Sequence, residues 1–278
     1  MQKTNLSLGF STCPNDTFIF EALVNNRFEA EGLEFTTHLT DVEELNKKAF
    51  SGTYDITKMS MFAYSQLSEH YQILDSGSAL GTNNGPLLIS NKKINIYQIE
   101  KYNIAIPGKN TTANFLLTAL YPQVQNKTEM LFSEIEDAIL NGEVDAGLII
   151  HESRFTYQQK GLQKIIDLGQ RWERRTGLPV PLGCIAIKRN LPEEIKIKVN
   201  NAIKKSIEIA FSNPEYALPY CKQHANTMTN EVMLQHIVLY VNKYSLSLGD
   251  EGKEAIKTLF DNAKTMGIVK DELKDIFA

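Results

Sequence analysis

The residues best suited to chemistry lie in one short segment of the chain. His151, Glu152 and Arg154 directly follow residues 146–150, an apolar run with the composition of a buried strand. An imidazole titrates near neutrality and can act as a general base, typically worth about 10² to 10⁴ in rate. A histidine that only completes the packing would show the same local pattern. We predict His151 as the catalytic residue and Arg154 as a substrate contact, with a structural histidine as the alternative.

Three further segments place small polar side chains just before an expected helix. Their candidate substrate-binding residues are Ser11 and Asn15 in the first segment, Lys58, Met59 and Ser60 in the second, and Asn110, Thr111 and Thr112 in the third. Free backbone N–H groups at a helix start attract carboxylates and phosphates. Capping of the helix without any ligand is the more common role for such residues, and it stays open here. The third segment lacks the spacing of a nucleotide-binding P-loop, which favours a small carboxylate.

These four segments need a scaffold that brings them together. Expected strands at residues 6–10 and 33–38 alternate with expected helices at residues 17–24 and 41–51. This alternation predicts an α/β protein with parallel or mixed sheets and helices on both faces. Because ligands of open α/β sheets bind beyond the carboxyl ends of the strands, the candidate segments should meet as loops around one cleft.

The chain is long enough for two lobes around that cleft. A polar connection near residue 90 and a segment rich in Pro and Gly at residues 176–183 mark the places where the chain would cross between them. We therefore predict a discontinuous larger lobe, residues 1–90 plus 184–278, and an inserted smaller lobe, residues 91–183. Apolar positions along residues 195–211 recur at helical spacing, which predicts a helix packed on the larger lobe.

Composition excludes several classes of protein. Lys and Arg number 29 and Asp and Glu 33, giving a net charge of −4 with both signs scattered, which is unlike a nucleic-acid-binding protein. No export signal and no membrane-spanning apolar run are visible, so we expect no membrane association. Three cysteines far apart suggest neither disulfides nor a zinc site, and reduced thiols fit the cytoplasm.

The remaining histidines have weaker cases as site residues. His38, His70, His224 and His236 each lie within a strand or helix pattern, and no pair has the H-E-x-x-H spacing of a metal site. We therefore predict no bound metal. The oligomeric state is left open, with a homodimer as one option.

Longer motifs give the chain a family resemblance. They are GFSTCPNDTFIF at residues 9–20, TKMS at 57–60, PGKNTT at 107–112, AGLIIHESRFTY at 146–157, RTGLP at 175–179 and YVNKYSL at 240–246. With these motifs, the chain resembles the 1,4-dihydroxy-6-naphthoate synthases of the futalosine route to menaquinone. The matches are spread over nearly the whole chain, which makes them far more specific than any single motif.

The resemblance implies a two-lobed fold like that of type II periplasmic solute-binding proteins. It also implies a lyase that converts cyclic dehypoxanthinylfutalosine to 1,4-dihydroxy-6-naphthoate, releases dihydroxyacetone and needs no cofactor. The family's catalytic base falls on His151, and its substrate contacts fall on residues 58–60, Thr111 and Thr112. The expected partner is thus a small anionic substrate.

Two other functions remain in view. A solute-binding protein would capture a ligand without chemistry, and the lack of an export or lipidation signal argues against it. Chorismate dehydratase, a fold-related enzyme of the same route, is the second alternative. The long match at residues 151–157 favours the naphthoate synthase.

Overall fold

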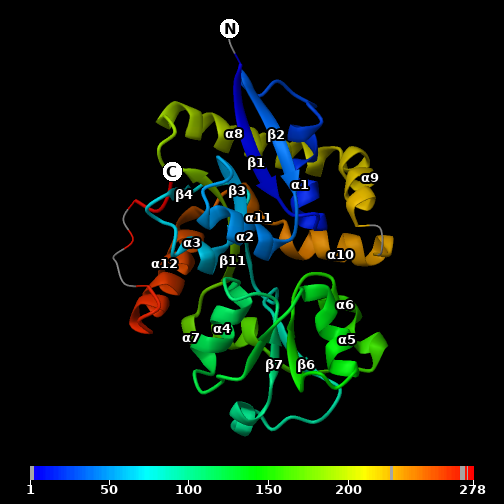
Figure 1. Cartoon of the computed structure of the whole chain (residues 1–278). Coiled ribbons are helices and arrows are strands. Elements are labelled where there is room, and N and C mark those ends of the chain that lie inside the picture. Colours follow the sequence, from blue (N-terminus) through cyan, green and yellow to red (C-terminus); the bar gives the residue numbers. More distant parts are fainter. Residues whose placement is uncertain (1–2, 226–227, 270–272, 274) are drawn as a thin grey trace.

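Two β-sheets, one above the other in Figure 1, form the framework of the chain. The structure is a computed structural model, and it describes residues 3–225, 228–269, 273 and 275–278. Helices pack on each sheet, so each sheet forms one lobe. The upper, larger lobe holds the first and last described residues, and the lower lobe is built from the middle of the chain. The α/β class with mixed sheets that the sequence predicts is confirmed.

The sheet of the larger lobe has six strands, in the order β2-β1-β3-β11-β4, with β5 paired to β11 beside this path. Their bounds are β1 Thr4–Phe10, β2 Leu33–Leu39, β3 Ile56–Ser60, β4 Tyr71–Ile73, β5 Ala79–Gly81 and β11 Val180–Lys188. β1 runs parallel to both of its neighbours, whereas β11 runs antiparallel to β3, β4 and β5. The mixed sheet therefore depends on β11, a strand that follows the inserted lobe in the sequence.

The sheet of the smaller lobe has five strands, in the order β10-β6-β9-β7-β8. Their bounds are β6 Leu87–Ser90, β7 Ile104–Ile106, β8 Lys127–Glu129, β9 Ala146–Ile149 and β10 Gln163–Asp167. β7 runs parallel to β8 and β9, and β6 runs antiparallel to β9 and β10. The loop that follows β9 starts at the cleft between the lobes, and it carries His151.

Helices of the larger lobe come from both ends of the chain. They are α1 Pro14–Val24, α2 Val42–Phe50, α3 Met61–Tyr64, α8 Glu193–Ser212, α9 Pro214–His224, α10 Asn230–Tyr240, α11 Lys243–Leu246 and α12 Gly249–Thr265. The smaller lobe carries α4 Thr112–Leu120, α5 Ile135–Leu140, α6 Ser153–Thr156 and α7 Leu168–Thr176, with short 3-10 helices at Ile96–Lys101, Phe132–Glu134 and Tyr157–Lys160. Figure 1 shows α10 directly above α5 and α6, beside the gap between the lobes.

Local sequence explains where the two helices nearest the cleft begin. Pro14 starts α1 because its missing N–H and fixed φ suit the first helical position, and Cys13 before it is the N-cap. Asp41 caps α2 by accepting hydrogen bonds from the backbone N–H groups of Glu43 and Glu44. Both helices therefore present their amino-terminal turns toward one end of the sheet.

Apolar burial holds the elements in place. One cluster packs α1, α8, α9 and α10 on β1, with Leu8 and Phe10 from the strand and Ile203 and Ile207 from α8 fully buried. The helix predicted from the spacing over residues 195–211 is α8, and it packs against α1 as expected. A second cluster runs from the larger lobe into the smaller one and includes Trp172. The lobes thus share a continuous core at the crossing segments.

Sheet membership places the lobe boundaries a few residues earlier than the sequence suggests. β6 was expected to close the larger lobe before residue 91, but it belongs to the second sheet. Residues 180–183 were expected in the smaller lobe, but they are the first part of β11 in the first sheet. A polar or Pro-rich stretch indicates an exposed connection in the chain. It does not indicate which sheet the neighbouring strand belongs to.

Residues 58–60 were expected to form a loop, and this was wrong. They are the end of β3, paired with Gly183, Cys184 and Ile185 of β11. All five residues of β3 are buried, so the strand lacks the alternation by which a half-exposed strand is identified. The backbone of Lys58 is therefore fixed by the sheet, which gives its side chain a rigid base.

Two glycines allow the segment between β5 and β6, which crosses from the larger lobe to the smaller one, to pack closely on α7 of the smaller lobe. A Cβ on Gly85 would lie 2.4 Å from Gly169 Cα. This clash is with backbone atoms, so no change of side-chain rotamer can relieve it. We expect Gly85→Ala to lower the free energy of unfolding by about 1 to 3 kcal/mol, the usual cost of overpacking, in urea denaturation. Gly252→Ala is the control, because the helical Gly252 would meet only side-chain atoms, at 3.3 Å or more, and alanine favours a helix. Equal stability of the two variants would contradict this reading.

Candidate active site

A cleft lies between the lobes, and most of the predicted site residues line it. Those residues are Ser11, Asn15, Lys58, Met59, Ser60, Thr111, Thr112 and His151. They come from both lobes, as expected for a site assembled by closing two lobes. The structure brings into the same cleft several residues that the sequence does not single out as contacts, among them Asp16, Asn84, His236 and Tyr240.

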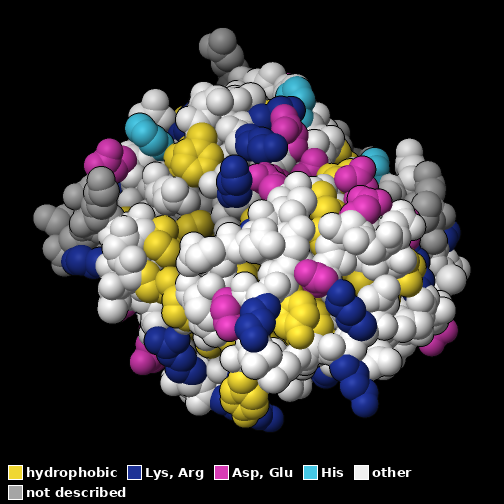
Figure 2. All heavy atoms as spheres, turned by 60° about the horizontal axis from the view of Figure 1, so that its bottom comes forward, with side chains coloured by type: hydrophobic (Ala, Val, Ile, Leu, Met, Phe, Trp, Pro, Cys, Tyr) yellow, Lys and Arg dark blue, Asp and Glu magenta, His cyan; other side chains and the backbone are white. Residues whose placement is uncertain are grey.

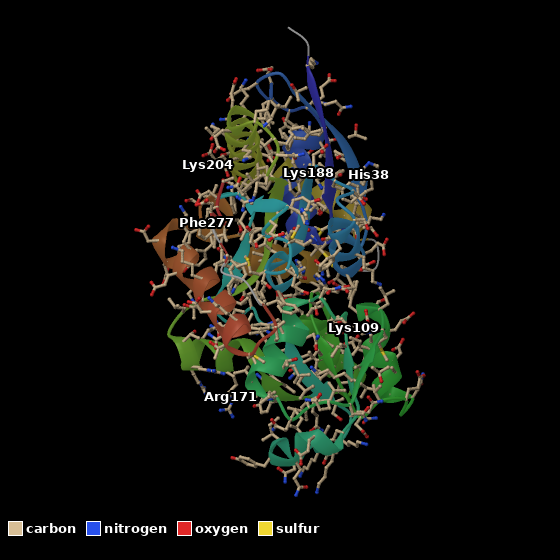
Figure 3. All side chains as sticks on the ribbon, turned by 60° about the vertical axis from the view of Figure 1, so that its left-hand side comes forward. His38, Lys109, Arg171, Lys188, Lys204 and Phe277 are labelled. Carbon is tan, nitrogen blue, oxygen red and sulfur yellow. The ribbon has the colours of Figure 1, made fainter. Side chains whose placement is uncertain are left out.

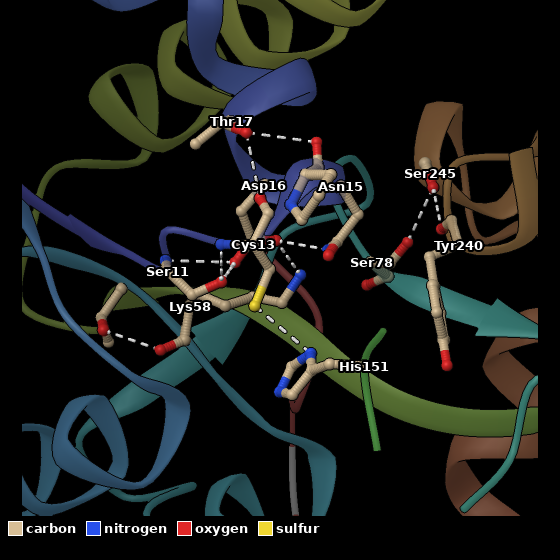
Figure 4. Close-up of polar contacts among 12 residues, drawn as sticks. Ser11, Cys13, Asn15, Asp16, Thr17, Lys58, Ser78, His151, Tyr240 and Ser245 are labelled. Atoms are coloured by element: carbon tan, nitrogen blue, oxygen red, sulfur yellow. Dashed lines mark hydrogen bonds and ion pairs between the residues drawn. The ribbon is translucent and has the colours of Figure 1, made fainter. Parts of the chain in front are cut away.

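A buried ion pair forms one wall of the cleft (Figure 4). Lys58 Nζ lies 2.7 Å from Asp16 Oδ1, and the two side chains are only 7% and 1% exposed. Asp16 also accepts hydrogen bonds from the Ser11 hydroxyl, at 2.6 Å, and from the Asn15 amide, at 2.7 Å. Its place in the first turn of α1 favours a negative charge. An ammonium has three donors, so Lys58 can hold Asp16 and still donate to a ligand.

The hydroxyl of Ser60 is oriented by a residue of α2. Asn46 Nδ2 donates to Ser60 Oγ at 3.1 Å, and the Asn46 carbonyl oxygen accepts from the Ser60 backbone N–H at 2.9 Å. This reciprocal pair fixes the end of β3. Because Ser60 Oγ accepts from Asn46, its own O–H hydrogen can donate into the cleft.

Thr111 and Thr112 line the cleft, but both hydroxyls make structural hydrogen bonds. Thr111 is the N-cap of α4, and its Oγ1 accepts from the Asn114 N–H and donates to the Gly108 carbonyl. Thr112 Oγ1 donates to the Leu182 carbonyl at 2.7 Å, so it ties α4 to β11. The anion-binding capacity of this segment therefore resides in the backbone N–H groups at the start of α4.

His151 lies on the loop after β9 and faces the larger lobe. Its backbone has φ of +55°, a conformation that is uncommon for a residue with a side chain and that directs the ring. Its Nδ1 lies 3.3 Å from Cys13 Sγ, across the interlobe boundary, as Figure 4 shows. Its Nε2 is buried and has no hydrogen-bond partner among the described residues. One ring nitrogen is thus engaged, and the other is free for a ligand.

Charge states around His151 follow from burial. Burial lowers the pKa of the His151 imidazole, although Glu152 and Asp16 act in the opposite direction. Burial, together with the negative charge of Asp16, raises the pKa of the Cys13 thiol far above its usual range. At neutral pH the contact therefore joins a neutral imidazole to a neutral thiol.

Two predicted contacts lie outside the lining of the cleft. Arg154 pairs with Asp167 Oδ2 at 2.9 Å and also donates to the backbone carbonyls of Asn83 and Gly85, so it fastens the crossing segment to the smaller lobe. Asn110 Nδ2 donates to Glu43 Oε1 at 2.8 Å, a contact between lobes. Each of the two residues is held by a buried acidic partner, and its contact with the substrate stays a prediction from the sequence.

His236 and Tyr240 are site residues that sequence reasoning missed. They are four residues apart on α10, so they share one face of that helix, and both line the cleft. The spacing was visible in the sequence, but it does not reveal which face of a helix meets a site. His38, by contrast, is an exposed residue of β2 at the outer surface of the larger lobe, as Figure 3 shows.

Side chains of both charge signs are interspersed over the face drawn in Figure 2. In the described part of the chain, no three His, Cys, Asp or Glu side chains group as metal ligands would. The described helices include none that is long and apolar enough to cross a membrane.

Comparison with known proteins identifies the family. The model of the family described as menaquinone biosynthesis matches residues 6–265. The chain belongs to this family. A curated family relative from Thermus thermophilus, named 1,4-dihydroxy-6-naphtoate synthase, is 43% identical over 98% of both chains. One with the same name from Streptomyces coelicolor is 37% identical, covering 97% of this chain and 96% of the relative. The family resemblance read from the motifs is confirmed, and so is the prediction of an enzyme of menaquinone biosynthesis.

Solved structures confirm the expected fold. A protein of Archaeoglobus fulgidus superimposes with a TM-score of 0.90 at 32% identity, covering 95% of this chain and 98% of the other. The periplasmic aliphatic sulphonate binding protein of Escherichia coli superimposes with a TM-score of 0.66 at 12% identity, over 99% of this chain and 91% of the other. The second likeness concerns the fold alone. The family enzyme is thus built on the two-lobed framework of periplasmic binding proteins.

Proposed function

We propose that this enzyme converts cyclic dehypoxanthinylfutalosine to 1,4-dihydroxy-6-naphthoate and releases dihydroxyacetone, with His151 as the general base. The observation that supports this most directly is a neutral imidazole that lines the interlobe cleft and whose buried Nε2 has no hydrogen-bond partner among the described residues. Full-length similarity to curated relatives named for this product supports the reaction.

The contact with Cys13 supports Nε2 as the basic nitrogen of His151. If Nδ1–H of His151 donates to the Cys13 sulfur, the lone pair of the neutral ring lies on Nε2, which has no hydrogen-bond partner among the described residues. Nε2 then takes an acidic proton from the ring-fused substrate. The electron pair left behind moves onto a substrate oxygen, and its return breaks the bond to the sugar-derived carbons in an elimination or retro-aldol-like step. The leaving fragment takes the proton from His151, and aromatisation of the ring makes the step downhill. Cys13 is a positioning residue in this scheme.

Two groups of residues that line the cleft together with the proposed base would bind the substrate. The amino-terminal turn of α4 at Thr111 and Thr112 would hold the substrate carboxylate. Ser60 and Lys58 would donate to sugar-derived hydroxyl groups from β3. Lobe closure would exclude water from reactive intermediates. A small anionic ligand thus suits the cleft, while a homodimer and a cytoplasmic location stay predictions from the sequence.

The pH dependence of the reaction follows from the burial of His151. A general base must be neutral, and burial lowers the pKa of this imidazole from its ordinary 6.5. We therefore expect kcat/KM to stay level as the pH falls past 6.5 and to drop only as it passes through the lowered pKa of the ring. A profile of kcat/KM over about pH 5 to 8 measures this. An acid limb centred at or above the ordinary value would contradict it.

The reaction itself is tested with purified enzyme and cyclic dehypoxanthinylfutalosine. Absorbance and mass should show 1,4-dihydroxy-6-naphthoate forming together with an equal amount of dihydroxyacetone. Chorismate is the comparison substrate, and its turnover in place of the futalosine derivative would reassign the enzyme to chorismate dehydration. Tight binding of a small carboxylate without any turnover would instead indicate a solute-binding role.

A further inference from the structure

A second imidazole stands beside His151 in the cleft, supplied by the opposite lobe. His236 comes from α10 and is fully buried, yet it contributes to the lining of the cleft. Its ring lies nearly parallel to that of His151, with a centroid distance of 6.2 Å and an angle of 15° between the planes. A substrate ring system that touches one imidazole is therefore within reach of the other.

Neither ring nitrogen of His236 has a hydrogen-bond partner among the described residues. Its neighbours are the ring of Tyr240, at 4.6 Å between centroids, and the ring of Phe155, at 6.5 Å. Burying a polar group without a hydrogen bond costs free energy, and an apolar side chain would fill this aromatic surrounding without that cost. The polarity of the ring therefore indicates a partner that comes from outside the chain.

The His236 ring is neutral in this position. Burial lowers its pKa well below the ordinary value, and the nearby His151 and Lys58 act in the same direction. A neutral imidazole has one N–H donor and one lone pair. Two imidazolium cations so close together would repel each other. The two rings can thus divide two tasks, one accepting a proton and the other donating a hydrogen bond.

We propose that His236 is a catalytic residue whose neutral N–H donates a hydrogen bond to the substrate oxygen that becomes negative when His151 removes the proton. This inference rests on the proposed function. No proton leaves His236: the proton goes to His151 Nε2, the electron pair moves onto the substrate oxygen, and the N–H of His236 stabilises that charge. A fixed donor in a buried site acts most strongly on charge that develops in the transition state.

Three variants separate this role from packing. His236→Phe keeps a ring and removes the donor, while His236→Asn and His236→Gln keep an N–H near the positions of Nδ1 and Nε2. We expect the Phe variant to lose about 100-fold in kcat with KM changed less than about threefold, as when an oxyanion donor is removed. One of the two amide variants should recover at least about tenfold of that loss. Thermal unfolding of each variant shows whether it is folded.

The ring can also be observed in the parent enzyme, independently of any variant's folding. With ring-¹⁵N histidine, the His236 signals, assigned from the spectrum of His236→Gln, should report a neutral ring near pH 7. They should shift when 1,4-dihydroxy-6-naphthoate is added. Signals that do not respond to saturating product would overturn the proposal. A Phe variant within about threefold of the parental kcat, or two amide variants no better than Phe, would do the same.

The outcome also distinguishes this inference from the function on which it rests. A parent enzyme that does not turn over cyclic dehypoxanthinylfutalosine contradicts the proposed function, and the role of His236 falls with it. Parental turnover with an unimpaired Phe variant contradicts only the role of His236 and leaves His151 as the base.

Discussion

The His151→Ala variant is expected to bind cyclic dehypoxanthinylfutalosine but to turn it over about 10² to 10⁴ times more slowly, the usual contribution of a general base. The groups proposed to bind the substrate, at β3 and at the start of α4, do not depend on the imidazole. The dissociation constant should therefore change little while kcat falls. Single-turnover formation of 1,4-dihydroxy-6-naphthoate, together with direct titration of binding, measures both quantities.

The matched control for this prediction is His38→Ala. His38 is an exposed histidine of β2, its ring stacks on Tyr54 at a centroid distance of 5.1 Å, and it lies away from the cleft. We expect parental turnover from this variant. A folded His151→Ala enzyme that binds substrate and retains the parental kcat would exclude His151 as the base.

The Lys58→Met variant is expected to lose about 3 to 5 kcal/mol of unfolding free energy, because it leaves a buried carboxylate without its countercharge. Asp16 would keep its neutral donors, Ser11 and Asn15, but no cation. Urea denaturation followed by circular dichroism measures the change. Substrate binding should weaken as well, because the same ammonium lies on the cleft wall.

A double-mutant cycle and an exposed lysine test the cause of that loss. Adding Asp16→Asn to Lys58→Met removes the orphaned charge, so the double variant should be more stable than Lys58→Met alone. Lys109→Met is the control, since Lys109 is 77% exposed and its ion pair with Glu129 is 3.6 Å long. It should cost less than about 1 kcal/mol. A double variant no more stable than Lys58→Met would show that the charge is not what destabilises it.

The sequence predicts the class of fold and the segments around the cleft, because both depend on local patterns. Alternating strands and helices define an α/β framework, and polar residues at strand ends mark loops that the framework must gather. The family motifs add the two-lobed arrangement, which periodicity alone did not supply. His151, Lys58 and Ser60 accordingly lie in one cleft.

Other features depend on tertiary contacts that no local pattern encodes. β3 is buried on both faces, so residues 58–60 gave no strand signal. The ion pair of Arg154 with Asp167 was not visible in the sequence, because the packing of β10 against β6 places Asp167. His236 was given little weight because a histidine in a helical pattern is usually a surface or packing residue. Only the placement of α10 against the smaller lobe shows which face of the helix meets the cleft.

The order of the strands also bears on how the chain folds as it leaves the ribosome. Every strand of the smaller lobe has been synthesised by residue 167, so that lobe can close its sheet early. The larger lobe cannot, because β11 separates β3 from β4 and is complete only at residue 188. Until β11 has been synthesised, β3 has one edge without a partner strand, while the inserted lobe is being made. The smaller lobe can therefore hold the loop of the proposed base before Cys13, synthesised long before it, reaches the ring.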